Sequence, residues 1–185
     1  MFTKVKAAIP YRNCASETIV EVQMTTGIGI HLVGLADHFL KETLLRVMTA
    51  LDSLGYHIPG KKIIINIAPS LNGMDSSALD LPIAIGILAE SGQCPQAKLN
   101  KYILAGELGL DGSIRTIRNA KGIAEIAEQT GNCCILPLES VIDCEANFPN
   151  SVYAVSNFAD VVRILSADND FSDLLLKNVK SRLAD

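Results

Sequence analysis

The chain of 185 residues is long enough for one domain of ordinary size, and its composition of 49% hydrophobic and 19% charged residues excludes a disordered protein. The formal net charge of −4 and the absence of tryptophan argue against strong nucleic-acid binding by this chain alone. Phosphate binding needs clustered lysines and arginines, and base stacking needs aromatic rings. No apolar run has the length of a membrane span, and the first ten residues lack the apolar core of a signal peptide.

The first third of the chain is predicted to form strands. β-Branched residues and alternation predict them at FTKVKAAIP (2–10), TIVEVQMTT (18–26) and GIHLVGLA (29–36), with YRNCASE (11–17) as the first connection. An apolar stripe then predicts a helix from about Asp37, ended by Gly55. The stripe consists of Leu40, Leu44, Val47, Met48, Leu51 and Leu54.

The middle of the chain adds a strand, a helix and a hairpin. KKIIINIAP (61–69) has the composition of a buried strand. MDSSALDLPIAIGILAESG (74–92) predicts a helix, in which Pro82 is tolerated only if the helix begins shortly before it. YILAGELGLDGSIRTI (102–117) predicts a hairpin that turns at Asp111-Gly112.

The last third alternates between helices and strands. NAKGIAEIAEQTG (119–131) predicts a helix closed by Gly131, followed by strands CCILPL (133–138) and SVYAV (151–155) and a helix NFADVVRILSA (157–167). The alternation predicts an α+β (α/β-like) domain over residues 1–167, in which helices pack on a mixed sheet. Residues 168–185 are more polar and are predicted to be a separate tail.

No metal site or cofactor site is predicted in this chain. Its three histidines lack metal-ligand spacing, and its five cysteines (positions 14, 94, 133, 134 and 144) are odd in number and form no CxxC pair. We therefore expect reduced thiols and a cytoplasmic location. GYHIPGKK (55–62) matches the spacing of a phosphate-binding loop, but it leaves a predicted helix and enters a predicted strand, the reverse of the required context.

Two adjacent serines, Ser76 and Ser77, precede the apolar helix and invite two interpretations. As helix caps they would accept backbone hydrogen bonds, and Asp80 would complement the positive end of the helix dipole. As a nucleophile, a serine would need a base within hydrogen-bond reach, and three scattered histidines give no Ser–His–Asp spacing. The residues therefore favour capping.

Lys121 is the alternative base for a serine nucleophile. A catalytic lysine must be neutral, which requires burial that lowers its pKa. The helical spacing instead places Lys121 with Glu125 and Glu128 on a polar stripe, opposite the apolar stripe of the same helix. The spacing predicts an exposed, charged lysine.

Five segments occur in the order typical of one protein family. They are HLVGLADHFLKETLLRVMTAL (31–51), KKIIINIAPS (61–70), SSALDLPIAIGILAESGQ (76–93), YILAGELGLDGSIRTIR (102–118) and ILPLES (135–140). Residues 1–166 thereby resemble the start of ComM/YifB proteins, which are bacterial Mg-chelatase-like AAA+ ATPases. The resemblance implies a fold like the proteolytic domain of Lon. DFSDLLLKNVKSRLAD (170–185) resembles the family's entry into its ATPase module, with LLL in place of the part that bears Gly-Gln.

The resemblance implies a non-catalytic accessory N-terminal domain. The complete protein would be an ATPase that processes DNA during transformation and recombination, with ATP and magnesium bound by an AAA+ module of the same polypeptide. The AAA+ module would be the partner of this domain. The complete protein could form a ring-shaped homo-oligomer. DNA would be contacted only through the complete protein. No membrane partner is expected. A third alternative, a motor component of magnesium chelatase, has no ligand cluster in its favour.

A Lon-like Ser–Lys peptidase is the second alternative that the resemblance raises. Lys121 lies fifteen residues after Gly106, where Lon-type peptidases carry their catalytic lysine. The nucleophile position falls on Ala78 in the ungapped register and reaches Ser77 only with a shift of one residue. NGMDSSA (72–78) also lacks the family's Lys-Glu-Gly. No catalytic residue is therefore expected, and Ser77 and Lys121 would act only under this alternative.

Overall fold

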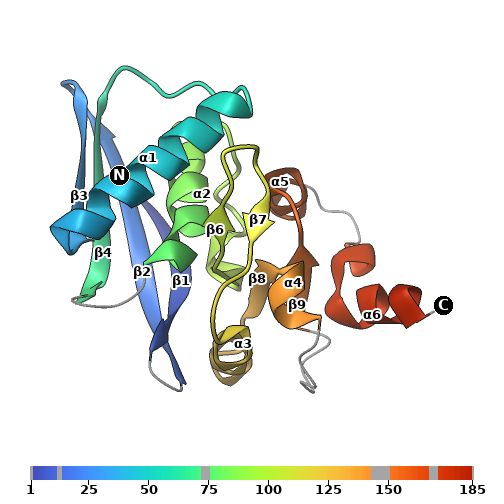
Figure 1. The fold of residues 1–185 in the computed structure, drawn as a ribbon. Coiled ribbons are helices and arrows are strands. Elements are labelled where there is room, and N and C mark those ends of the chain that lie inside the picture. Colours follow the sequence, from blue (N-terminus) through green and yellow to red (C-terminus); the bar gives the residue numbers. More distant parts are fainter. Residues whose placement is uncertain (1, 12–13, 72–75, 143–150, 167–170, 185) are drawn as a thin grey trace.

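A computed structural model describes residues 2–11, 14–71, 76–142, 151–166 and 171–184 (Figure 1). Within these ranges, helices pack on a mixed sheet, which confirms the predicted fold class. The strands are β1 (Thr3–Tyr11), β2 (Cys14–Thr25), β3 (Gly29–Leu35), β4 (Lys62–Leu71), β5 (Tyr102–Leu104), β6 (Glu107–Leu108), β7 (Ile114–Arg115), β8 (Cys133–Pro137) and β9 (Val152–Val155). The helices are α1 (Asp37–Ser53), α2 (Asp80–Glu90), α3 (Ala120–Gln129), α4 (Leu138–Val141), α5 (Phe158–Ser166) and α6 (Leu176–Ala184), with short 3₁₀ helices η1 (Ser77–Leu79), η2 (Leu99–Lys101) and η3 (Ser172–Leu174).

Seven strands form the main sheet in the order β3-β4-β2-β1-β5-β8-β9. β2 runs antiparallel to both β1 and β4, whereas β3 pairs with β4, β1 with β5, β5 with β8, and β8 with β9 in parallel. β6 and β7 form a separate antiparallel hairpin. The sheet is therefore mixed, with a run of parallel strands from β1 to β9.

Helix α2 is the centre of the core. Its residues from Asp80 to Ala89 are all buried, so this helix is apolar on every side and must be enclosed by other elements. It packs on β1 and β2, where a Cβ added to Gly86 would lie 2.7 Å from Cγ2 of Val22. The glycine lets the helix approach the sheet closely.

The opposite face of the sheet is covered only in part. Lys6 lies on that face and donates a hydrogen bond to Asn132, just after α3, at 2.9 Å. Helix α3 packs over β1, β2 and β8, and its buried residues are Ala120, Gly122, Ile123, Ala124 and Ala127. This agrees with the predicted apolar stripe, and Gly131 ends the helix with a φ of 66°.

Two predicted boundaries are wrong. The segment YRNCASE is not a loop beyond Asn13, because Cys14 to Glu17 continue β2 and pair with Tyr11 to Ala8 of β1. The predicted hairpin of residues 102–117 is also shorter than expected. Tyr102–Leu104 forms β5 of the main sheet, and only β6 and β7 form the hairpin around Asp111-Gly112. Pairing partners distant in the sequence decide both cases.

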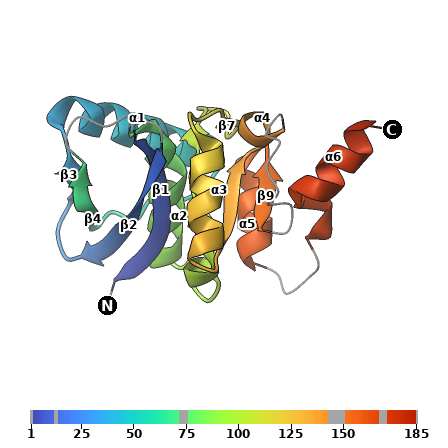
Figure 2. The ribbon, with the colours of Figure 1, turned by 90° about the horizontal axis from the view of Figure 1, so that it is seen from below.

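Residues after 170 pack against the β9 edge of the sheet. Leu175 forms an isolated bridge with Tyr153 of β9, and Phe171 and Leu176 are 7% and 2% exposed. Figure 2 shows α6 at one end of the molecule and β3 at the other. Among the described residues, no helix combines the length and the apolar character that a membrane crossing requires.

Candidate functional site

The β6–β7 hairpin lies at the carboxyl ends of parallel strands. It follows β5 directly, and its second strand bonds to the residues after β9, where Ile114 N–H donates to the carbonyl of Ser156 at 2.9 Å. Phe158 N–H donates to the carbonyl of Gly112, also at 2.9 Å. The crevice outside the carboxyl ends of strands is the usual ligand site of α/β sheets. Part of this edge is therefore covered by the chain's own hairpin (Figure 1).

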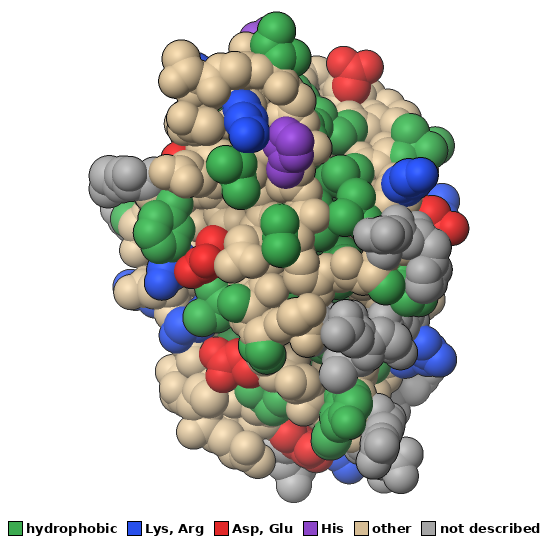
Figure 3. All heavy atoms as spheres, turned by 90° about the vertical axis from the view of Figure 1, so that its left-hand side faces the viewer, with side chains coloured by type: hydrophobic (Ala, Val, Ile, Leu, Met, Phe, Trp, Pro, Cys, Tyr) green, Lys and Arg blue, Asp and Glu red, His purple; other side chains and the backbone are tan. Residues whose placement is uncertain are grey.

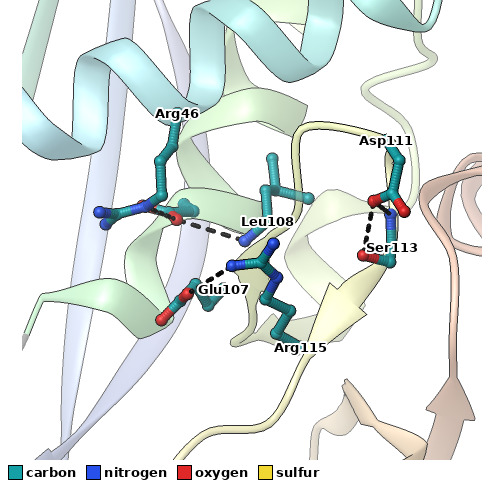
Figure 4. Close-up of polar contacts among 7 residues, drawn as sticks. Arg46, Glu107, Leu108, Asp111, Ser113 and Arg115 are labelled. Atoms are coloured by element: carbon teal, nitrogen blue, oxygen red, sulfur yellow. Dashed lines mark hydrogen bonds and ion pairs between the residues drawn. The ribbon is translucent and has the colours of Figure 1, made fainter.

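A buried ion pair fixes the other side of the hairpin (Figure 4). Asp80, at the first position of α2, is 0% exposed. Arg46 of α1 donates from Nε to Oδ2 at 2.7 Å and from Nη2 to Oδ1 at 3.1 Å. The backbone N–H of Leu108 in β6 donates to Oδ2 at 3.2 Å. One carboxylate thus joins α1, α2 and the hairpin.

Burial and the guanidinium of Arg46 shift the pKa of Asp80 in opposite directions. Burial raises the pKa of this carboxyl to about 6, although the hydrogen bonds and charge of Arg46 and the N–H of Leu108 oppose the rise. The pKa of Arg46 is raised by its hydrogen bonds to Asp80. Because three donors engage the two carboxylate oxygens and solvent does not reach them, this pair is a structural clamp rather than a substrate-binding acid or base.

Close backbone contact explains Gly106, the first residue of the segment Gly106-Glu107-Leu108 (GEL). Gly106 N–H donates to the carbonyl of Ala78 at 2.9 Å, and Leu81 N–H donates to the carbonyl of Gly106 at 3.0 Å. A Cβ on Gly106 would lie 2.9 Å from Cγ2 of Ile114. The segment Asp80-Leu81-Pro82 (DLP) at the start of α2 and the GEL segment are therefore one packed unit, in which β6 contacts the start of α2 directly.

Neither of the two serines occupies the cap position of α2, contrary to the prediction. Ser76 precedes η1 and Leu79 precedes α2, and neither position has a side-chain capping hydrogen bond. The 3₁₀ turn Ser77–Leu79 moves the start of α2 one turn beyond the serines. The carbonyl of Gly106 accepts from Leu81 N–H, one of the N-terminal donors that the serines were expected to satisfy. A distant backbone group thus replaces the local cap.

The structure places the two residues of the Ser–Lys alternative in different environments. Ser77 is partly buried in η1, whereas Lys121 is exposed at the second position of α3, as its spacing predicts. Asn119 caps α3, and its side-chain oxygen accepts from Gly122 N–H at 3.2 Å. No hydrogen bond joins Ser77 to Lys121 in the described part of the chain. Exposure leaves Lys121 without the desolvation that a neutral catalytic lysine needs.

The phosphate-loop spacing occurs in the reversed context that the sequence predicts. Gly55, with a φ of 79°, ends α1, and Lys62 begins β4. A phosphate-binding loop requires backbone N–H groups at the start of a following helix, and a strand offers no such positive end. Over the described ranges, no group of three or more His, Cys, Asp and Glu side chains could hold a metal ion. Cys14, Cys94, Cys133 and Cys134 are free thiols.

Arg46 is the site residue that the sequence interpretation missed. It lies on the helix of the first apolar stripe, and Asp80 was interpreted only as a complement to the helix dipole. The signal was present, because DLPIAIGILA (80–89) is otherwise apolar and a carboxylate at its start requires a buried partner. Which of the cations would be that partner depends on how α1 crosses α2, which the sequence does not state.

Comparisons with known proteins identify the family of this chain. The family model described as ChlI, Subunit ChlI of Mg-chelatase, matches residues 20–140. The chain is 41% identical over 118 residues to the Uncharacterized protein YifB of Escherichia coli (strain K12), covering 63% of this chain and 23% of that protein. A YifB protein of Salmonella typhimurium (strain LT2) is 37% identical over 125 residues, covering 67% and 25%.

A third relative extends the match further along the chain. The Competence protein ComM of Haemophilus influenzae is 30% identical over 148 residues, covering 80% of this chain and 29% of that protein. The chain thus spans less than a third of the length of these relatives. The resemblance drawn from the DLP and GEL segments is confirmed. The chain belongs to the Mg-chelatase ChlI family, among its ComM/YifB-type members.

Proposed function

We propose that this chain is a non-catalytic accessory N-terminal domain of a ComM/YifB-type ATPase. The observation that carries the proposal is the reversed context of GYHIPGKK, which ends α1 and leads into β4 and so offers no helix N-terminus to a phosphate. The clamp of Arg46 and Asp80 supports it, because an ion pair with a fully buried carboxylate holds the packed unit at the carboxyl edge together. The domain would position partners or stabilise an assembly.

The activity of the complete protein is part of the same proposal. The relatives are more than three times as long as the matched region, which leaves room for an AAA+ module that binds ATP and magnesium. The name of the Haemophilus relative, a competence protein, supports DNA processing during transformation in the cytoplasm. DNA would be contacted by the module, because this chain has a net charge of −4. A ring of complete proteins would be its assembly.

Calorimetry tests this division of labour. Titration of ATP with magnesium into the 185-residue chain is expected to give no binding heat up to millimolar nucleotide. A longer chain that includes the next module should bind under the same conditions and is the positive control. Micromolar affinity of the 185-residue chain would contradict the proposal.

The Ser–Lys peptidase alternative makes a different prediction. We expect Ser77→Ala and Lys121→Ala to leave the fold and the oligomeric state unchanged, and Lys121→Ala to change the free energy of unfolding by no more than about 0.5 kcal/mol, because this side chain is exposed. The measurement is covalent labelling by a fluorophosphonate, read by mass spectrometry, with Ser91→Ala as the matched serine variant. Labelling of Ser77 that Lys121→Ala abolishes would make the chain an enzyme.

A chelatase motor is the third candidate, and the description of the matching family, subunit ChlI of Mg-chelatase, favours it. It would insert Mg²⁺ into a porphyrin with the complete protein as motor. Genes of porphyrin synthesis next to this one would favour chelation, and genes of recombination would favour DNA processing.

A further inference from the structure

The two edge strands of the main sheet, β9 and β3, differ in what lies beside them. At the β9 edge, the chain itself forms the boundary, since Leu175 bridges Tyr153 and α6 packs beside the strand. At the other edge, β3 pairs with β4 on one side, and no described strand pairs with its other side. Alternate N–H and C=O groups of an edge strand point away from the sheet and can pair with another chain.

The β3 edge lacks the features that usually prevent pairing. Natural edge strands are blocked by charged side chains, above all lysine, or by proline. The fifteen residues from Val22 to Ala36 contain no Asp, Glu, Lys, Arg or Pro. Ile28 and Val33 are 88% and 57% exposed. A register shift at Gly34, whose φ is 98°, disrupts only the end of the strand, so Gly29–Val33 stays open.

The sheet face beside this edge carries exposed side chains. Leu32 points to the side of α1 and is 6% exposed, whereas its neighbours His31 and Val33 lie exposed on the opposite face. That face continues over β4 and β2 as a shallow hollow, and Figure 3 shows hydrophobic side chains on this side of the molecule. The hollow is lined by Phe2, Glu21, Val22, Gln23, Ile64 and Asn66.

We propose that the β3 edge is an interface through which two copies of this chain pair strand against strand. A two-fold axis would set the two β3 strands antiparallel and extend the sheet across both copies. The lack of charged residues in β3 favours a second copy of this chain as the partner of the edge. An acidic or basic peptide finds no opposite charge on β3 itself, while a second β3 brings an equally neutral, apolar strand with no like charges opposed. Centred on His31, the pairing sets Ile30 opposite Leu32 and Gly29 opposite Val33 and uses only the open part of the strand. The proposal goes beyond the accessory role and holds whichever reaction the complete protein performs.

Sedimentation of the 185-residue chain tests the pairing. Between about 1 and 500 µM, the weak end of protein association, the weight-average mass is expected to rise from 19.8 kDa toward twice that value. Val33→Lys and Ile28→Lys should each hold the chain at the monomer mass. Leu45→Lys is the matched control, since Leu45 is 70% exposed and lies on α1 rather than in β3, and it should associate like the unchanged chain.

Hydrogen exchange supplies a readout specific to the strand. Amides of Gly29–Val33 should exchange more slowly at high than at low concentration, and Val33→Lys should remove the difference. A monomer over the whole range would overturn the proposal. So would association that Leu45→Lys weakens as much as Val33→Lys, or association without added protection in β3. Binding of an unrelated extended peptide to a monomeric chain would assign the edge to a different partner and overturn it as well.

Discussion

Replacement of Arg46 by methionine is expected to lower the free energy of unfolding by about 3 kcal/mol at pH 7, because it leaves a buried carboxylate without its counter-charge. Asp80 is 0% exposed and would lose both guanidinium hydrogen bonds. The N–H of Leu108 would be its one remaining donor among the three. Urea denaturation of the variant and the unchanged chain measures the difference.

Two further variants make this result specific. Arg115→Met removes an exposed ion pair with Glu107, at 3.6 Å, and should cost no more than about 1 kcal/mol. Arg46→Met combined with Asp80→Leu removes both charges and should recover most of the loss, because a packed apolar pair replaces a buried ion pair well. If Arg46→Met and Arg115→Met had equal effects, the clamp would have no special role in stability.

The free energy of unfolding is expected to depend on pH through Asp80, and Asp80→Asn is expected to remove this dependence. The pKa of Asp80 is raised by burial from its ordinary value of 3.8 to about 6 in the folded chain. Between these values the folded chain holds a proton that the unfolded chain has lost, so a rise in pH favours unfolding. Protonated Asp80 contributes about 3 kcal/mol to the free energy of unfolding, at 1.36 kcal/mol per pKa unit. This contribution is lost as pH rises from about 4 to about 6.

Denaturation at a series of pH values gives the comparison. The stability of the unchanged chain, minus that of Asp80→Asn, should fall through this window by that amount. Asp111→Asn is the control. The hydrogen bonds from Ser113 lower the pKa of this exposed carboxyl, so its contribution is lost below pH 4 and not between 4 and 6. Parallel profiles of Asp80→Asn and the unchanged chain would contradict the assigned pKa.

Local patterns in the sequence predicted most elements correctly. The stripe beginning at Leu40 produced α1, the β-branched run of KIIINI produced β4, and Gly55 and Gly131 end their helices in the left-handed conformation. These features depend on residues a few positions apart, whose spacing and backbone preferences the sequence states directly. Exposure of Lys121 followed from the same helical spacing.

The errors have a common cause in contacts between distant residues. β2 is longer than predicted because Cys14–Glu17 find partners in β1, and β5 separates from the hairpin because it pairs in parallel with β1 and β8. The serines lose their capping role because Gly106, about thirty residues away, supplies the carbonyl. None of these pairings can be predicted from the sequence of the segment that forms it.

The sequence by itself therefore determined the mixed α+β class, the reversed context of GYHIPGKK and the family, since each depends on the order and spacing of short segments. The tertiary structure alone decided that Arg46 is the partner of Asp80, and that the hairpin covers the carboxyl edge. It also decided that β3 is an edge strand among the strands that the structure describes. The physical reason is that charge pairing, capping by distant carbonyls and strand order depend on which elements become neighbours in space. That selection is made by the packing of α1, α2 and the sheet as a whole.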